Sequence, residues 1–97
     1  MAKAYFIGQF EIHDPAGYDV YRSQTAATIA PHGGRFIVRG GRVQNFVGEP
    51  PLPRVVVIEF PSFDQAKAWY DSEAYRKLIP IRQKAAKGRS FLVEGAE

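Results

Sequence analysis

Residues 31–41 have the sequence PHGGRFIVRGG, and this stretch predicts the end of a helix, a strand and a turn in quick succession. Its proline cannot continue a helix, and the glycine pair at 33–34 offers the left-handed backbone on which helices commonly end. Residues 35–39 form a short run of strand-forming side chains, and the glycine pair at 40–41 can make a two-residue hairpin turn. We therefore expect strands at 35–39 and 43–47, with a helix before them.

The segments before this stretch predict a strand followed by that helix. In residues 4–12, every second side chain belongs to one mostly apolar set and the others form a second set. This period of two is typical of a β-strand, whose side chains point to opposite faces in turn. Asp14 followed by Pro15 is typical of a helix start, because the aspartate caps the first turn and the proline fits its first position. Apolar and aromatic side chains then recur at helical spacing, so we expect this helix to run to about Ala30.

The segments after it predict a buried strand, two helices and a last strand. Residues 55–58 are VVVI, and an unbroken β-branched run is typical of a strand covered on both faces. Ser62 begins the pattern of a capping box, and a further helix is expected from Ser72 until Gly88 closes it. We expect the last strand at residues 90–94.

The resulting order, β-α-β-β-α-β, is the split ferredoxin-like arrangement, an α+β fold in which both helices cover one face of an antiparallel sheet. A chain of 97 residues has the size of one domain, so we expect a single domain over 1–97. The opposite face of the sheet then has no layer of its own, although the strand at 55–58 has the composition of one covered on both sides. We therefore expect a homodimer joined sheet to sheet.

Composition and charge are those of an ordinary soluble globular protein. The hydrophobic share is 45% and the charged share 24%, and no apolar run approaches the roughly 18 residues of a membrane span. The net charge is +3, but the cations are interleaved with carboxylates, and the strand at 55–58 is aliphatic where an RNA-recognition sheet needs stacking aromatics. We therefore expect neither a membrane nor a nucleic acid as partner. The sequence has no cysteine, which excludes disulfides and thiolate chemistry, and we expect a cytoplasmic location.

Several short motifs occur in an order and spacing typical of one family. They are Asp14, Pro15 and Tyr18; the run HGGR at 32–35; the glycine pair at 40–41; Arg54 and the run VIEFP at 57–61; and Trp69, Ser72, Tyr75 and Arg82. With these motifs the sequence resembles, over essentially its whole length, the family called domain of unknown function 1330 (DUF 1330) in the dimeric α/β-barrel superfamily. The resemblance implies a ferredoxin-like fold paired into a barrel, and no established reaction. Better-known members of the superfamily include cofactor-independent monooxygenases, haem-degrading enzymes and lactone isomerases, so it also implies a ligand-holding cleft between sheet and helices.

One polar cluster is expected where the first helix ends. If neighbouring strands alternate in direction, His32, Arg35 and Glu59 converge there beside Tyr5. The imidazole can exchange a proton near neutral pH, the guanidinium can hold a carboxylate or enolate oxygen, and the carboxylate can orient the imidazole. We therefore predict His32, Arg35 and Glu59 as catalytic residues. A structural interpretation is equally open, with the histidine complementing the helix end and a salt bridge joining Arg35 to Glu59.

Aromatic and cationic side chains elsewhere are candidates for ligand binding. Aromatic residues on helix faces that point at the sheet are mostly core, yet their hydroxyl and indole groups suit a pocket for a flat or cyclic organic ligand. Arg54 and Arg82 are expected near the opposite end of the sheet, where they can form an anion-binding mouth. The predicted ligand-binding residues are Tyr5, Tyr18, Tyr21, Arg54, Trp69, Tyr75 and Arg82.

We predict no metal and no cofactor. His13 and Asp14 are adjacent, but a metal site needs more convergent ligands than these two. Arg39 and Arg42 flank the predicted turn at 40–41 and would face each other, a like-charge pair that solvent at a loop tip relieves.

The sequence leaves three functions open. The first is a small-molecule enzyme of acid–base, isomerase or cofactor-independent monooxygenase type. The second is a module that binds a small acidic or aromatic metabolite without turnover, and the same residues serve it equally well. The third is a dimer with a purely structural or interaction role.

Overall fold

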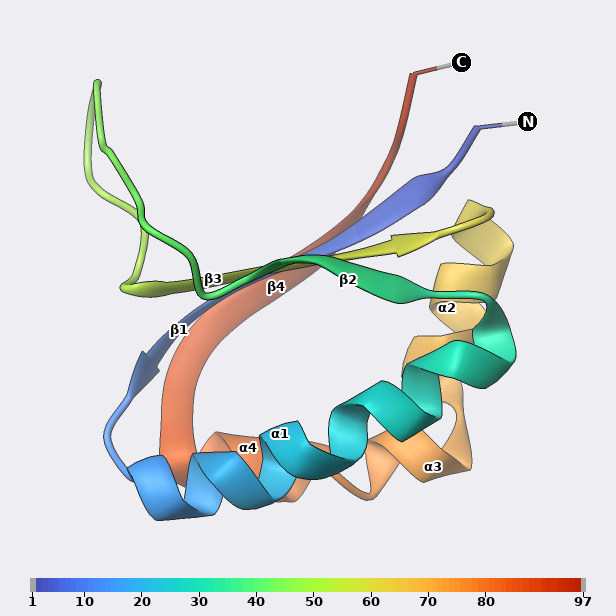
Figure 1. Cartoon of the computed structure of the whole chain (residues 1–97), viewed down its shortest axis with the longest axis horizontal. Coiled ribbons are helices and arrows are strands. Elements are labelled where there is room, and N and C mark those ends of the chain that lie inside the picture. Colours follow the sequence, from blue (N-terminus) through green and yellow to red (C-terminus); the bar gives the residue numbers. More distant parts are fainter. Residues whose placement is uncertain (1, 97) are drawn as a thin grey trace.

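The computed structural model describes residues 2–96, and it contains a four-stranded sheet with the helices on one side (Figure 1). The elements in chain order are β1 (Ala4–Ile12), α1 (Pro15–Ile29), the 3-10 turn η1 (Ala30–His32), β2 (Arg35–Arg39), β3 (Arg54–Phe60), α2 (Phe63–Asp71), α3 (Glu73–Arg76), α4 (Ile79–Ala85) and β4 (Ala86–Glu94). The strand order is β2-β3-β1-β4, and each neighbouring pair is antiparallel. The predicted ferredoxin-like α+β fold is therefore confirmed.

Both ends of α1 form as the sequence predicts. Asp14 Oδ1 accepts a hydrogen bond from the backbone N–H of Gly17 at 3.2 Å, and Pro15 is the first helical residue. At the other end the chain passes from Ile29 into η1 and reverses at Gly33, whose φ of 77° lies in the left-handed region that glycine favours. The helix therefore ends where the glycine pair begins, and the chain enters β2.

The predicted strand at 43–47 is wrong. β2 pairs with β3, and residues 40–53 between them form a long exposed loop. The predicted strand has no apolar layer against which to pack, because Phe46 and Val47 are 87% and 89% exposed. The β-branched run of β3 does have one, so β3 takes the place beside β2.

The predicted pairing of Arg39 with Arg42 is wrong for the same reason. Arg39 lies opposite Val56 in the β2–β3 ladder, and its guanidinium lies 4.0 Å from the centre of the Phe36 ring. Gly40, with a φ of 71°, turns the chain out of the sheet while its N–H still donates to a β3 carbonyl. Arg42 follows in the exposed loop, away from that ladder.

The last third of the chain also departs from the prediction. The single helix expected from Ser72 is two short helices, α3 and α4, and Gly88 lies inside β4 instead of closing a helix. β4 begins at Ala86, earlier than the expected strand at 90–94. Glycine is needed inside this strand because a side chain at Gly88 would collide with the Gln9 carbonyl oxygen of β1.

The two faces of the sheet have different surroundings. The helix-facing side carries the core, whose largest fully buried side chains are Trp69, Tyr75, Phe60, Ile29 and Ile58. Among residues 2–96, no helix covers the other side, which we call the open face (Figure 1). Its apolar side chains are Tyr5, Ile7, Val55, Val57, Phe91 and Val93.

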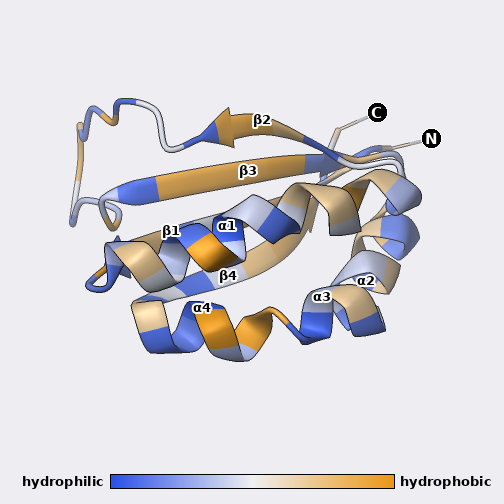
Figure 2. Ribbon diagram, turned by 60° about the horizontal axis from the view of Figure 1, so that its bottom comes forward, coloured by the Kyte–Doolittle hydropathy of each residue, from blue (hydrophilic) through white to orange (hydrophobic). Residues whose placement is uncertain are grey.

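The open face is apolar over its central strands, as the sequence predicted for the run at 55–58. Figure 2 shows β3 as hydrophobic along most of its length. Val56 and Ile58 are buried against the helices, whereas Val55 and Val57 are only half-buried on the open face. Within residues 2–96, no helix combines the length and apolar character that crossing a membrane requires.

Candidate functional site

Two of the predicted catalytic residues lie side by side on the open face. Arg35 and Tyr5 are each opposite Glu59 in the ladders that flank β3. The Glu59 Oε1 lies 3.3 Å from Arg35 Nε and 3.5 Å from Lys3 Nζ. The Glu59 side chain is 15% exposed, but both cations reach solvent, and ion pairs of this kind stabilise a fold only weakly.

The third predicted catalytic residue, His32, lies in η1. Its backbone carbonyl accepts a hydrogen bond from Gln65 Nε2 at 3.4 Å. Within residues 2–96, no hydrogen bond joins the imidazole to Glu59, whose carboxylate contacts Arg35 and Lys3 instead. The catalytic role of His32, Arg35 and Glu59 therefore stays a prediction, with the Arg35–Glu59 contact as its observed part.

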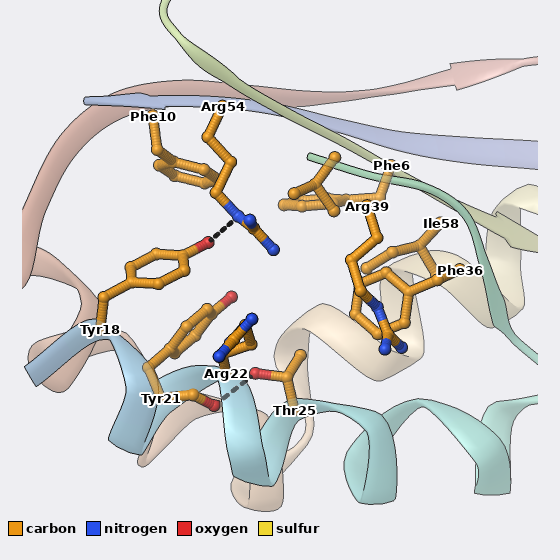
Figure 3. Close-up of a pocket in the computed structure, with 11 residues that line it drawn as sticks. Phe6, Phe10, Tyr18, Tyr21, Arg22, Thr25, Phe36, Arg39, Arg54 and Ile58 are labelled. Atoms are coloured by element: carbon orange, nitrogen blue, oxygen red, sulfur yellow. Dashed lines mark hydrogen bonds between the residues drawn. The ribbon is translucent and has the colours of Figure 1, made fainter. Parts of the chain in front are cut away.

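A second polar group lies between α1 and the helix-facing side of β2 and β3, in a space that we call the α1 cleft (Figure 3). Its inner cavity measures about 20 Å³, room for roughly one water molecule. The walls that the strands contribute are aromatic and aliphatic. They are Phe6, Phe10, Phe36, Val56 and Ile58.

Three arginines bring guanidinium groups to the α1 cleft, Arg22 from α1, Arg39 from β2 and Arg54 from β3 (Figure 3). Arg54 Nε donates to the Tyr18 hydroxyl at 3.2 Å, and the guanidinium carbon lies 5.4 Å from the centre of that ring. Arg22 pairs with Asp19 at 2.9 Å. Among residues 2–96, no carboxylate lies within salt-bridge distance of Arg39 or Arg54, so the cleft carries uncompensated positive charge.

A fourth arginine, Arg82, lies behind the cleft with only 9% of its surface exposed. Its Nη1 donates to the Tyr75 hydroxyl at 2.9 Å, and that hydroxyl lies 2.8 Å from the Tyr21 hydroxyl in the cleft wall. The guanidinium carbon also lies 5.5 Å from the centre of the Phe10 ring. Burial lowers the pKa of Arg82, but the neighbouring hydroxyl groups of Tyr75, Tyr21 and Tyr70 together raise it by more, so the group stays charged.

Burial keeps the phenols of Tyr18 and Tyr75 protonated. It raises the pKa of Tyr75 well above the ordinary value of 10.0, although the charge of Arg82 acts in the opposite direction. Burial also raises the pKa of Tyr18, and Arg54 offsets part of that rise. At neutral pH both groups are therefore neutral hydroxyls that can donate a proton to a hydrogen bond.

These shifts predict how the protein responds to alkaline pH. A phenol whose pKa is higher in the folded state than in the unfolded state stabilises the fold fully below pH 10, and this stability is lost as the pH rises beyond that value. Of the five tyrosines, we expect Tyr18 and Tyr75 to ionise only together with unfolding. Tyrosinate absorbance and far-ultraviolet circular dichroism, followed together through an alkaline titration, measure this. Ionisation of all five with unchanged circular dichroism would contradict it.

A groove of about 250 Å³ lies beside the α1 cleft near the start of α1. Tyr18, Arg22 and Arg54 line both the inner cavity and this groove. Ile12, Pro15 and Asp19 complete the groove. A ligand in the groove would therefore meet Tyr18, Arg22 and Arg54, whereas Tyr21 and Arg39 line the inner cavity only.

The predicted ligand-binding residues fall into three places. Tyr18, Tyr21 and Arg54 line the α1 cleft, and Tyr75 and Arg82 lie directly behind it. Trp69 is fully buried in the core, where its Nε1 donates to Thr28 Oγ1 at 3.0 Å, and Tyr5 lies on the open face.

The sequence analysis missed Arg22 and Arg39 as cleft residues. Arg22 follows Tyr21 directly and lies one helical turn after Tyr18, so the helical periodicity that identified the two tyrosines also pointed toward it. Arg39 could not be found in this way, because the wrong hairpin placed it at a loop tip. Pairing with β3 instead turns Arg39 to the helix-facing side.

The donors of the α1 cleft suit an anionic oxygen better than a cation. Guanidinium groups and arginine-bonded phenols offer hydrogen-bond donors and positive charge, the features that bind carboxylates, phenolates and enolates. Within residues 2–96, no three histidine, aspartate or glutamate side chains gather as a metal ligand set would.

Solved structures of other proteins share this fold at low sequence identity. A protein of unknown function from Rhodopseudomonas palustris has a TM-score of 0.77 and 16% identity, with 99% of this chain and 84% of that chain covered. SnoaB, a cofactor-independent oxygenase from Streptomyces nogalater, has a TM-score of 0.63 and 15% identity over 100% of this chain and 96% of its own. A dimeric ferredoxin-like protein of unknown function from Thermobifida fusca has a TM-score of 0.60 and 16% identity, covering 99% and 92%. These likenesses show the fold alone.

Sequence comparison gives the family. No curated protein matches the chain. The model of one family, described as a domain of unknown function, matches residues 3–96, which is nearly the whole chain. The protein therefore belongs to the DUF1330 family, as its motifs indicated.

Proposed function

We propose that this protein is a homodimer that binds a small acidic aromatic metabolite in the α1 cleft. One observation carries this proposal. The guanidinium groups of Arg39 and Arg54 lie at an aromatic-walled cavity and have no carboxylate partner among residues 2–96.

A charged group at a partly enclosed site is stabilised by an opposite charge bound beside it. Arg54 is partly buried, and taking its guanidinium partly out of water costs free energy, which a bound anion offsets through charge-assisted hydrogen bonds. Arg39 is exposed and adds positive charge at the rim. Tyr18, together with Ile12 and Pro15, offers an apolar surface in the neighbouring groove on which an aromatic ring can lie. A small molecule that combines a ring with an acidic group fits both features.

The homodimer has its own support. The open face is apolar, and the structurally similar protein from Thermobifida fusca is dimeric. A second copy of the chain would cover both open faces at once through a two-fold axis. The α1 cleft lies on the opposite, helix-facing side of the sheet, so such a dimer leaves it accessible.

Catalysis is the second candidate function. SnoaB shares the fold and is a cofactor-independent oxygenase, which supports an enzyme on fold likeness alone. The predicted catalytic residues His32, Arg35 and Glu59 do not line the inner cavity of the α1 cleft. Binding is therefore the function that the observed geometry supports first, and acid–base chemistry is a proposal that extends it.

Replacing Arg54 by glutamine tests the binding proposal. Isothermal titration with benzoate and 4-hydroxybenzoate should show binding to the wild type, and neutral benzamide should bind more weakly. We expect Arg54→Gln to weaken carboxylate binding about tenfold or more, because one charge-assisted hydrogen bond is lost. The matched control is Arg76→Gln, which removes the same charge from an exposed position on α3.

The control separates site binding from general charge attraction. If Arg76→Gln weakens binding as much as Arg54→Gln does, the effect comes from net charge and the cleft is not the site. If the wild type binds the anions no better than benzamide, the proposed ligand class is wrong.

A further inference from the structure

The hydrogen bonds behind the α1 cleft have a fixed direction. A guanidinium group can only donate, so the Tyr75 oxygen accepts the hydrogen bond from Arg82. Tyr75 has a single hydroxyl hydrogen, and within residues 2–96 the one other group at hydrogen-bond distance from it is the Tyr21 hydroxyl, 2.8 Å away. The pair is satisfied when Tyr75 donates to Tyr21, because the reverse arrangement leaves the buried hydrogen of Tyr75 without an acceptor. The hydroxyl hydrogen of Tyr21 is then left for the cleft.

The hydroxyl hydrogen of Tyr18 is also left for the cleft. Its oxygen accepts from Arg54 Nε at 3.2 Å, and no acceptor for its own hydrogen lies within reach among residues 2–96. Tyr18 and Tyr21 are three positions apart on α1, and their ring centres are 5.4 Å apart. Figure 3 shows both hydroxyls directed toward the hollow beneath Arg54. Two hydroxyl donors from one helix thus face the same space.

We propose that Tyr18 and Tyr21 form a paired donor site that binds one anionic oxygen of the ligand, a phenolate or enolate oxygen, and so selects the ionised form of a phenol or enol. This inference rests on the proposed function and specifies the ligand class of the same site. Tyr75 and Arg82 are positioning residues, since they act on the ligand only through Tyr21.

Two features of the cleft fit this assignment. The Tyr18 oxygen accepts from the Arg54 guanidinium, and the Tyr21 oxygen accepts from Tyr75, which itself accepts from Arg82. Such hydrogen bonds polarise both hydroxyls into stronger donors. Fixed donors aimed at a single oxygen are the arrangement that stabilises developing negative charge in oxyanion sites. The inner cavity of about 20 Å³ has room for an oxygen-sized group, and the groove of about 250 Å³ outside it has room for the ring.

Titration of bound 4-nitrophenol tests the proposal, because its phenolate absorbs visible light and its ionisation is read directly. A site that prefers the anion lowers the pKa of the bound probe relative to the free probe, by about one unit for a tenfold preference. We expect such a shift in the wild type. Tyr18→Phe and Tyr21→Phe keep the ring and remove the donor, so each should reduce the shift and weaken phenolate binding about tenfold. Ser23→Ala is the control, since it removes a hydroxyl from the exposed side of α1.

The outcomes distinguish this inference from the proposed function. An unshifted pKa of the bound probe, or a full shift retained in both phenylalanine variants, would overturn the donor pair while leaving the α1 cleft as an anion site. Binding of benzoate without binding of 4-nitrophenol has the same meaning. If the wild type binds neither probe, the proposed function is wrong and the donor pair is wrong with it. Circular dichroism of each variant confirms that the fold is retained, and if one variant fails to fold the other still decides.

Discussion

Replacing Val57 by lysine should convert the proposed dimer into monomers. Val57 lies on the open face in β3, opposite Ile7 of β1 on one side and Val38 of β2 on the other. A sheet-to-sheet dimer buries this position in both subunits at once, so the substitution places two unpaired charges in one apolar interface. We expect the dissociation constant to rise by roughly a hundredfold or more. Sedimentation velocity over a range of concentrations measures it.

The matched control for this substitution is Val20→Lys. Val20 lies on α1, is half exposed, and receives the same change of side chain away from the open face. It should leave the dissociation constant unchanged. A wild type that sediments as a monomer, or a Val57→Lys variant that dimerises as tightly as the wild type, would show that the open face is not the interface.

The fold was predictable where one local pattern decides it. Asp14 and Ser62 cap their helices through hydrogen bonds within a few residues, and the glycine pair after η1 ends α1 by backbone conformation alone. The run at 55–58 requires burial whatever surrounds it, so a β-strand was predicted there and found as part of β3.

Strand pairing was harder to predict because it depends on competition between distant segments. The glycine pair at 40–41 is compatible with a tight hairpin, and nothing local excludes a strand at 43–47. Residues 43–47 and β3 compete for the place beside β2. β3 occupies it because burial of its apolar side chains stabilises the fold more than burial of Phe46 and Val47 would. The wrong hairpin also misplaced Arg39. The prediction put this residue at a loop tip, whereas the observed pairing of β2 with β3 brings it to the α1 cleft.

Most residues of the candidate site were predictable from the sequence, but the contacts between them were not. Helical spacing predicted that Tyr18, Tyr21 and Tyr75 point at the sheet, and Arg82 was expected with Arg54 at one end of it. Periodicity predicts the side of a helix on which a residue lies, but it does not predict which hydroxyl groups form hydrogen bonds with each other. The Tyr21–Tyr75 contact joins residues 54 positions apart, and it exists because α1 packs against the helices that follow β3. The direction of this hydrogen bond, on which the donor pair depends, follows from the contact of Tyr75 with Arg82, whose guanidinium can only donate.

Replacing Trp69 by alanine should cost about 3–5 kcal/mol of the free energy of unfolding, a large share of the roughly 5–15 kcal/mol typical of a small domain. The indole is fully buried, and its ring centre lies 4.2 Å from that of Tyr75, 5.1 Å from that of Phe6 and 5.3 Å from that of Phe60. Alanine leaves a cavity between the sheet and α3 that these rings cannot close without moving. Urea unfolding followed by circular dichroism measures the loss.

The control Thr28→Val separates packing from hydrogen bonding. It removes the acceptor of the Trp69 Nε1 hydrogen bond and keeps the indole in place, so it should cost only about 1–3 kcal/mol. If the two variants lose equal stability, the hydrogen bond and not the packing of the indole holds α1 to the core. Because Tyr75 both contacts Trp69 and donates to Tyr21, we also expect Trp69→Ala to weaken phenolate binding in the α1 cleft, whereas Thr28→Val leaves it intact. Titration of 4-nitrophenol with the folded fraction of each variant decides whether the core positions the donor pair.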